Sequence, residues 1–340
     1  MARHTRDYQC VGTTQTQDCE MKVLIVKKKD SCFPFVEEQA DALTQLGIEV
    51  AWHLISGKGV RAYIRDIPSL CKEIISEKPN IVHAHYGISG YYTSLLIRLM
   101  RPFFRCPVVI TYHGSDINDS SIRKISQKAI NRADYNIFVS SMLAQQVQHS
   151  SNAQVIPCGI NIEEWQLLEK NEARKTMGLE EQKKIILFCS DYKTPIKNPS
   201  LAIESVQQLC KLANEDVQLI EMKGYSRKQV NILLCAADVC LMTSLSEGSP
   251  QIIKEAMACG CPIVTTRVGD VECVIDKAKG CYYTGYSIDE CARQLQKALN
   301  FANTYNRTNG RKRIEALGYT NDIVAGKIES IYQELTNTQD

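Results

Sequence analysis

Residues 244–262 read SLSEGSPQIIKEAMACGCP, a run that follows a predicted strand and predicts a short loop and a helix. Ser249 followed by Pro250 is typical of a helix N-cap and first turn, because a serine hydroxyl can accept from a free backbone N–H and proline at the first position gives up no hydrogen bond. Such a helix would begin in a crevice, where its free amides and positive dipole end favour phosphate. The stretch therefore predicts a phosphate site ahead of the helix.

Two glutamates belong to the same stretch. Glu255 lies beside Ile252 and Ile253, so we expect its carboxylate to be at least partly buried and to need donors, which the two hydroxyls of a ribose would supply. Glu247 precedes the helix and can reach a sugar hydroxyl beyond the phosphates. The spacing alone leaves open a second interpretation, a capped and solvated helix with two surface carboxylates.

Short β-branched runs alternate with amphipathic segments on both sides of this stretch, which is typical of parallel sheets covered by helices on both faces. Strands are predicted at residues 23–26, 49–55, 81–84, 108–112, 136–139, 154–156, 184–189, 217–222, 239–243 and 262–265, and helices at residues 36–46, 201–212, 227–236, 250–259, 287–301 and 320–335. A polar, helix-like connector at residues 161–182 separates two series of alternating strands and helices.

The sequence thus predicts an α/β fold of two Rossmann-like, doubly wound domains. The expected division is a polar extension (1–20), a first domain (21–165), a second domain (166–318) and a closing helical segment (319–340). In such domains ligands bind at the carboxyl ends of the strands.

The composition favours a cytoplasmic two-domain protein. A chain of 340 residues exceeds the usual limit of one core, and 40 basic against 38 acidic residues give no reason to expect nucleic acid as a partner. The 15 cysteines fall within apolar runs without C-x-x-C spacing, which indicates small core residues in a reducing compartment rather than a zinc site. Residues 1–20 lack the apolar region of a signal peptide, and no apolar stretch reaches the ~18 residues needed to span a membrane.

A dinucleotide site is the strongest competing signal. Residues 57–62 read GKGVRA, which fits G-x-G-x-x-A between a strand and a helix. The run follows the second strand rather than the first, and no acidic residue follows the next strand to hold a ribose. We interpret the two glycines as a tight loop.

Residues 244–262, with Val264, Gly269 and Asp270 after them, resemble the E-x7-E signature of the family 4 retaining glycosyltransferases, which have the GT-B fold. Other segments resemble that family in the same order, and they are VHAHYG at residues 82–87, TYHGSD at 111–116, IPCGIN at 156–161 and KNP at 197–199. The resemblance extends from about residue 21 to residue 335. Tyr192 stands where the family commonly has an arginine, and residues 30–33 replace its glycine-rich loop.

The resemblance implies a hexosyltransferase that moves a hexose or N-acetylhexosamine from a UDP- or GDP-linked donor to a glycan or lipid-linked acceptor, with retention, in surface polysaccharide biosynthesis. It implies catalytic roles for Glu247, His113 and Lys197, donor binding by Lys193, Lys197, Gly224, Tyr225, Gly248, Ser249, Pro250 and Glu255, and acceptor binding by His85 and Asp116. Without the resemblance, His113 would be a structural hydrogen-bonding residue. The closing helix would cross back to the first domain, as in GT-B folds.

No cofactor or metal is expected. The leaving nucleoside diphosphate carries the charge that must be stabilised, and Lys197, Lys193 and the amides ahead of Pro250 can do so. The chain contains no D-x-D that could bridge a metal to a pyrophosphate. Two other classes stay open: a GT-B sugar-nucleotide epimerase or hydrolase, and a non-catalytic sugar-nucleotide binding module.

The first domain also carries a signal for peripheral contact with an anionic membrane. Residues 94–105 place Arg98, Arg101 and Arg105 among apolar residues, and four more basic residues follow in the next helical segment, namely Arg123, Lys124, Lys128 and Arg132. Apolar bulk beside arginines suits anionic headgroups. The alternative is a core stripe of Leu95, Leu96 and Leu99 with the arginines on a solvated face.

Overall fold

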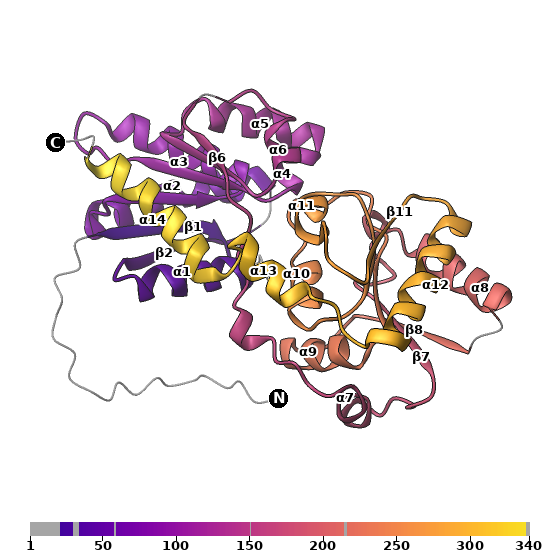
Figure 1. Cartoon of the computed structure of the whole chain (residues 1–340). Helices are drawn as coiled ribbons and strands as arrows, with labels where there is room; N and C mark the ends of the chain where they lie inside the picture. The colour runs from indigo at the N-terminus through magenta and orange to yellow at the C-terminus, as the bar shows by residue number, and fades with distance from the viewer. Residues whose placement is uncertain (1–20, 30–33, 58, 150, 214–215, 338–340) are drawn as a thin grey trace, which may run out of the picture.

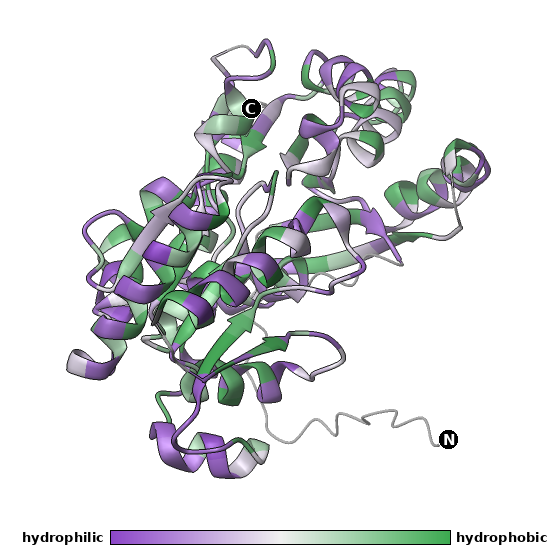
Figure 2. Ribbon diagram, turned by 90° about the vertical axis from the view of Figure 1, so that its right-hand side faces the viewer, coloured by the Kyte–Doolittle hydropathy of each residue, from purple (hydrophilic) through white to green (hydrophobic). Residues whose placement is uncertain are grey.

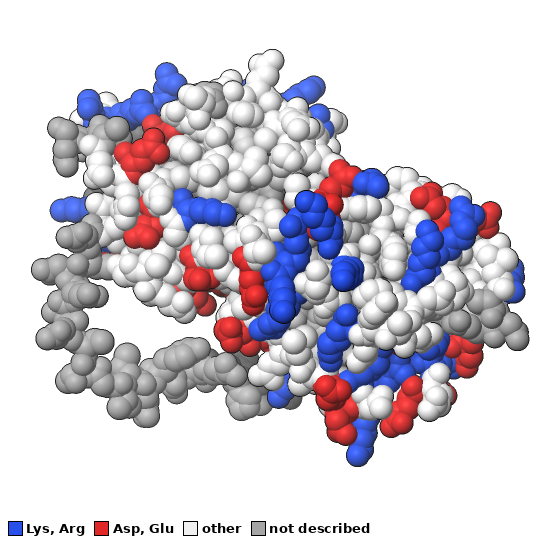
Figure 3. Space-filling view, viewed as in Figure 1, with Lys and Arg blue, Asp and Glu red and all other residues white. Residues whose placement is uncertain are grey.

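The structure is a computed structural model that describes residues 21–29, 34–57, 59–149, 151–213 and 216–337. It contains two α/β domains side by side, joined near the middle of the molecule (Figure 1). The expected polar extension at residues 1–20, the loop at residues 30–33 and Lys58 lie outside the described residues. Both basic and acidic side chains lie on the face in Figure 3, where Lys and Arg gather over its middle and over the second domain.

The first domain is built on a six-stranded parallel sheet with the order β2-β1-β3-β4-β5-β6. Its strands are β1 (Lys22–Lys28), β2 (Glu49–Ile55), β3 (Ile81–His85), β4 (Val108–Tyr112), β5 (Tyr135–Phe138) and β6 (Ala153–Val155). Its helices are α1 (Pro34–Gln45), α2 (Gly59–Glu77), α3 (Gly87–Met100), α4 (Ser115–Asn118), α5 (Ser120–Ile130) and α6 (Ser141–Ala144).

Both faces of this sheet are covered, which is why its central strands are continuous apolar runs. Leu24 and Val26 of β1 pack in the core beneath α2 and α3, whereas Val23 and Ile25 pack in the core beneath α1. The period of two along a strand sends neighbouring side chains to opposite faces. Figure 2 shows the same division, with hydrophobic residues along the strands and hydrophilic residues on the outer sides of helices.

The second domain has a five-stranded parallel sheet with the order β11-β10-β9-β7-β8. Its strands are β7 (Lys184–Phe188), β8 (Val217–Glu221), β9 (Val239–Met242), β10 (Ile263–Thr266) and β11 (Cys281–Thr284). The helical elements after the first domain are η1 (Ile162–Glu164), α7 (Lys170–Met177), η2 (Pro195–Lys197), α8 (Pro199–Ala213), α9 (Arg227–Ala236), α10 (Gln251–Ala258), α11 (Val271–Ile275), α12 (Ile288–Tyr305), α13 (Gly310–Leu317) and α14 (Asn321–Asn337).

The closing helix α14 crosses back to the first domain, as predicted. Its apolar side, which includes Ile328 and Tyr332, packs in the core that also contains Val23 and Ile25 of β1. Figure 1 shows α14 in yellow along the first domain beside α1. The chain passes between the domains twice, and the two passes meet where Ile160 forms a parallel bridge with Thr320.

The sequence did not predict β11, α11 or α13. β11 is a short edge strand with a half-buried Tyr282 and Tyr283, so it lacks the continuous apolar run of a central strand. The connector at residues 161–182 is helical only in η1 and α7. Among the described residues no helix is both long and apolar enough to cross a membrane.

Candidate active site

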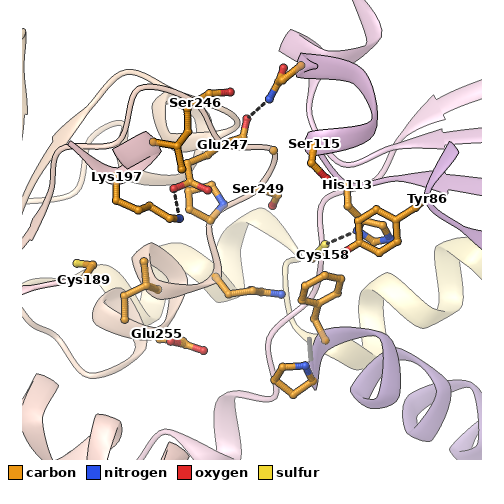
Figure 4. A pocket seen from close by; sticks show the side chains of 18 of the residues that line it. Tyr86, His113, Ser115, Cys158, Cys189, Lys197, Ser246, Glu247, Ser249 and Glu255 are labelled. Atoms are coloured by element: carbon orange, nitrogen blue, oxygen red, sulfur yellow. Dashed lines mark hydrogen bonds and ion pairs between the residues drawn. The ribbon is translucent and has the colours of Figure 1, made fainter. Parts of the chain in front are cut away.

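A cavity of about 930 Å³ lies between the two domains at the carboxyl ends of both sheets (Figure 4). Its walls come from α1, from loops after β3 and β4, and from four segments of the second domain. The first domain contributes residues that include Phe35, Glu38, Tyr86, His113 and Cys158, and the second domain contributes residues that include Lys197, Arg227, Glu247, Gly248, Ser249, Pro250 and Glu255. The structure therefore brings these side chains together at one crevice.

The two domains touch where two glycines allow close approach of their backbones. A Cβ atom on Gly248 would lie 1.9 Å from the carbonyl oxygen of His113, and one on Gly114 would lie 2.9 Å from the nitrogen of Gly248. Gly114 also has a φ of +133°, which favours glycine. The amide of Asn118 donates to the carbonyl of Glu247 across the same junction, at 3.2 Å. These contacts place the loop that carries Glu247 directly against the loop that carries His113.

Lys197 and Glu247 form an ion pair on the second-domain wall of the cavity. Lys197 ends η2, and its carbonyl accepts from the hydroxyl of Thr243 at 2.9 Å. The lysine side chain is 29% exposed and the glutamate side chain 14%, so both face the cavity while the surrounding protein restricts their motion. Glu247 thus fixes the Lys197 ammonium at the second-domain wall of the cavity.

The start of α10 differs from the prediction at Ser249. Pro250 occupies the N-cap position, α10 begins at Gln251, and no side chain caps the helix. Instead the Ser249 hydroxyl donates to Asp270 at 2.6 Å and accepts from Lys254. The N-cap prediction for Ser249 is therefore wrong, because a buried lysine and carboxylate compete for its hydroxyl more effectively than a backbone amide.

Lys254 was not predicted as a site residue, and it is fully buried one position before Glu255. Its ammonium donates to the carbonyl of Cys158 at 2.7 Å and lies 3.4 Å from Asp270. A buried cation requires this set of oxygen partners. Lys254 thereby ties α10 to the segment that joins the domains.

Glu255 faces the cavity, and its carboxylate has no hydrogen-bond partner among the described residues. Burial raises the pKa of Glu255 to about 7, against the opposing influence of Arg227. Arg227, at the start of α9, is paired with Glu38 of the first domain at 2.6 Å and with Glu164 at 3.0 Å. The hydrogen-bond donors that the sequence led us to expect for Glu255 are thus not supplied by the described residues.

Three histidines form a column that runs from the cavity into the interior of the first domain. His113 lines the cavity, and its Nε2 lies 2.9 Å from Nδ1 of His85, which in turn stacks on His83. Burial lowers the pKa of His113 to about 3 and the pKa of His85 well below 6.5, so both rings are neutral. His85 is fully buried and does not line the cavity. The prediction that His85 faces the cleft is therefore wrong, because His113 lies between it and the cavity.

Asp116 is also buried behind the wall rather than exposed in the cleft. Its carboxylate accepts from the backbone amides of Gly114 at 2.8 Å, Gly87 at 3.0 Å and His113 at 3.1 Å. Burial raises the pKa of Asp116 to about 6, and these amides oppose that effect. The prediction that Asp116 orients an acceptor directly is not met by this placement, since the carboxylate holds the His113 loop instead.

Three predicted donor residues, Lys193, Gly224 and Tyr225, are exposed and do not line the cavity. Tyr192, at the position of the family's arginine, stacks on Phe188 with ring centroids 5.2 Å apart. Lys197 and Arg227 are therefore the cations of the second-domain wall. Arg227 was missed because its partner Glu38 lies 189 positions earlier, so no local pattern joins them. Lys254 could have been found, since a lysine inside the apolar run of α10 already required a buried partner.

Comparisons with known proteins agree with this architecture. The sequence model described as Glycosyltransferase Family 4 matches residues 33–164, and the model described as Glycosyl transferases group 1 matches residues 198–300. The putative teichuronic acid biosynthesis glycosyltransferase TuaC of Bacillus subtilis is 28% identical over 220 residues, which cover 58% of this chain and 56% of that protein. The chain thus spans little more than half the length of this relative.

Solved structures share the fold at low sequence identity. Sucrose-phosphate synthase of Thermosynechococcus elongatus has a TM-score of 0.77 and 16% identity, over 94% of this chain and 100% of that one. HepE of Anabaena, solved in complex with UDP, has a TM-score of 0.66 and 15% identity, over 94% and 99%. With two family matches on successive domains and two facing Rossmann-like domains closed by a crossing helix, the chain belongs to family 4 of the glycosyltransferases and has the GT-B fold.

Proposed function

We propose that the protein transfers a hexose or N-acetylhexosamine, with retention of configuration, from a nucleotide-sugar to a glycan or lipid-linked acceptor. The observation that carries this proposal is the Glu255 carboxylate, which faces the interdomain cavity and has no partner in the described part of the chain. A ribose diol supplies two donors to such a group, and an ionised carboxylate accepts both. The diphosphate then lies toward Lys197 and the start of α10.

The reaction breaks the bond between the anomeric carbon and the phosphate oxygen, and the electron pair of that bond stays on the phosphate. Lys197, held by Glu247, and the backbone amides ahead of α10 stabilise this negative charge as it develops. An acceptor hydroxyl approaches the same face, and the leaving phosphate oxygen takes its proton as the new bond to carbon forms. No separate strong base is required, in accordance with the neutral state of His113.

His113 contributes as a hydrogen-bonding residue rather than as a cation. Its Nε2 is engaged by His85, and its Nδ1 lies 3.7 Å from the sulfur of Cys158, which is a weak partner. A hydroxyl of the transferring sugar can replace that thiol at Nδ1. The first domain thus orients the sugar, and the second domain holds the nucleotide.

UDP is the nucleotide that we propose first, because the structurally similar HepE was solved with it. A surface polysaccharide is the proposed destination, since the relative TuaC is assigned to teichuronic acid biosynthesis. Metal is not expected to be needed, because the chain has no D-x-D and Lys197 supplies the charge. Turnover should therefore continue in excess chelator, whereas loss in chelator that Mg²⁺ or Mn²⁺ restores would contradict this.

The test is release of nucleoside diphosphate from a panel of nucleotide-sugars with and without glycan acceptors. Release that depends on the acceptor supports transfer. Release that is equally fast without acceptor would indicate a hydrolase or epimerase, and binding without turnover would indicate a binding module. Either of the last two outcomes contradicts the proposal.

A further inference from the structure

A second feature of the first domain lies away from the candidate active site. Two adjoining hollows of about 380 and 210 Å³ share Arg101 and Asp134 in their walls. Arg105 lines the larger hollow, and Arg98 and Arg132 line the smaller one. We call these four arginines and the hollows between them the arginine groove. Asp134 is the only acidic residue among the described residues that line it.

The charge of the arginine groove is largely uncompensated. Asp134 already accepts from the backbone amide of Val108 at 2.8 Å, and it lies 3.5 Å from Arg101. Nη1 of Arg132 is buried and has no hydrogen-bond partner within the described part of the chain, while its guanidinium lies over the ring of Tyr91 at 4.8 Å. A buried donor without a partner is uncommon. The groove is therefore suited to the oxygens of an anion such as a phosphate.

Exposed apolar side chains lie in the same segment. Phe103 is 92% exposed and Leu99 is 69% exposed, although Leu96 and Ile97 one turn earlier are buried. The core-stripe interpretation is thus correct for Leu96 but wrong for Leu99. Apolar side chains beside arginines are typical of surfaces that lie in the headgroup region of a bilayer. Free inorganic phosphate would give no reason to expose a phenylalanine beside the groove.

The arginine groove lies at the opposite edge of the sheet from the cavity. Arg105 lies shortly before β4 and Asp134 directly before β5, whereas Tyr86 and His113 come directly after β3 and β4. Helix α3 runs from the cavity to the groove, and its 14 residues are about 21 Å long. Arg123, which the sequence placed with the basic cluster, instead donates to the carbonyls of Ile117 and Asn118 nearer the cavity.

We propose that the arginine groove, together with Phe103 and Leu99, is a docking surface for a bilayer with anionic headgroups. Lipid phosphates occupy the groove and Phe103 enters the interfacial region. This docking proposal does not depend on the proposed transfer reaction. If the transfer reaction also holds, the cavity stands about 20 Å above the headgroups. A lipid-linked acceptor would then reach it only through several sugars between its lipid and its growing end.

The test is co-sedimentation of the full chain with vesicles of phosphatidylglycerol and phosphatidylcholine, against vesicles of phosphatidylcholine alone. Binding should require the anionic lipid and should weaken as salt screens the charges. The variant with Arg98→Gln, Arg101→Gln and Arg105→Gln should partition about 100-fold more weakly, from roughly 1 kcal/mol per basic residue. Phe103→Ser should weaken the binding that persists at moderate salt.

The matched control removes the same charge from exposed residues of the second domain, with Lys175→Gln, Arg293→Gln and Lys297→Gln. It should sediment like the unchanged protein, and equal melting temperatures should show that all variants fold. The proposal is overturned if the unchanged protein stays in the supernatant with anionic vesicles at low salt, or if both triple variants lose binding equally. It is also overturned if inorganic phosphate raises the melting temperature through the groove while vesicles do not bind. Because sedimentation needs no turnover, failure here is distinct from failure of the proposed transfer.

Discussion

At the scale of single residues, three charged side chains in or next to the candidate site differ in how many partners the protein gives them. Lys197 has a partner in Glu247, Lys254 has three oxygen partners in the interior, and Glu255 has none among the described residues. Glu255 is half-buried at the cavity, and removal of its carboxylate from water without compensating donors raises its pKa. Under the proposed function, the donors that this carboxylate lacks are the hydroxyls of the ligand.

Glu255→Gln should weaken binding of a nucleoside diphosphate by about 1.5–3 kcal/mol, because an amide has half the acceptor capacity of the carboxylate. Isothermal titration with UDP would measure it. The control is Glu204→Gln, an exposed glutamate on α8, which should bind like the unchanged protein. Equal affinity of Glu255→Gln and the control would remove Glu255 from the ribose site.

The same carboxylate predicts a pH dependence. With a folded pKa of about 7 against 4.5 in the unfolded chain, the folded state binds more protons between these values, so this group lowers stability as pH rises through that window. Ribose hydroxyls need the ionised acceptor, so UDP affinity should increase as pH rises from about 6 to 8. The UDP affinity of Glu255→Gln should lack this increase. The phosphate of UDP titrates in the same pH range for both proteins, so subtracting one pH profile from the other removes its contribution. Parallel pH profiles would contradict the assignment.

Lys197→Gln should lower kcat by roughly 100-fold or more, the usual effect of removing a group that stabilises developing charge. Lys193→Gln should change kcat less than about twofold, since that exposed side chain does not line the cavity. Steady-state kinetics on both variants separate the two lysines that the sequence treated alike. Comparable losses would mean that Lys193 reaches the phosphates.

At the scale of elements, the contact between the loop after β4 and the loop before α10 fixes the separation of the domains. Two glycines permit it, and each would place a Cβ against backbone of the other domain. Backbone cannot move aside as a flexible side chain can. The loops therefore act as a unit, although they are more than 130 residues apart in the chain.

Gly248→Ala should force these loops apart and lower kcat by about tenfold or more, with a smaller effect on nucleotide affinity because α10 itself is not displaced. Gly326→Ala in α14 is the control, since a Cβ there meets nothing within 4 Å. That change should leave activity intact and slightly raise stability, because alanine favours a helix more than glycine. Undiminished kcat in Gly248→Ala would show that the close approach is not needed for turnover.

At the scale of the whole molecule, α14 joins the end of the chain to the core of the first domain. The hydroxyl of Tyr332 is hydrogen-bonded to Nδ1 of His83, and Nε2 of His83 lies 2.7 Å from the hydroxyl of Thr111. Burial lowers the pKa of His83 to about 3, so the ring is neutral and uses one nitrogen as donor and the other as acceptor. The last helix thereby completes the polar core beneath the His113 loop.

Tyr332→Phe should lower the free energy of unfolding of the first domain by about 1–3 kcal/mol, because it leaves a buried ring nitrogen without its partner. Urea unfolding followed by circular dichroism would measure the change. Tyr305→Phe is the matched control, as Tyr305 is 67% exposed and should tolerate loss of its hydroxyl. If both variants unfold at the same urea concentration, the buried hydrogen bond contributes little.

Local patterns in the sequence predicted the parallel strands, the last helix, and the place of Glu247, Gly248 and Glu255 at one crevice, whereas the crossing of the last helix was predicted from the family resemblance. Such patterns work because the apolar period of a strand or helix and the turn before α10 involve neighbours in the chain. They predicted Ser249 wrongly as an N-cap, because Asp270 competes for its hydroxyl from 21 positions away. The hydroxyl of Ser249 instead bonds to Asp270 and Lys254, which a local pattern around Ser249 does not reveal.

The tertiary structure alone decided which polar residues face the cavity. His85 and Asp116 follow or adjoin strands just as His113 does, yet they are buried behind it, and their depth depends on how the loops after β3 and β4 fold over each other. Arg227 lines the cavity while paired with Glu38 of the other domain and with Glu164, and neither partner is near it in the sequence. Sequence determines which residues lie at the carboxyl ends of strands, whereas packing between separate loops and domains determines which of them a ligand can touch.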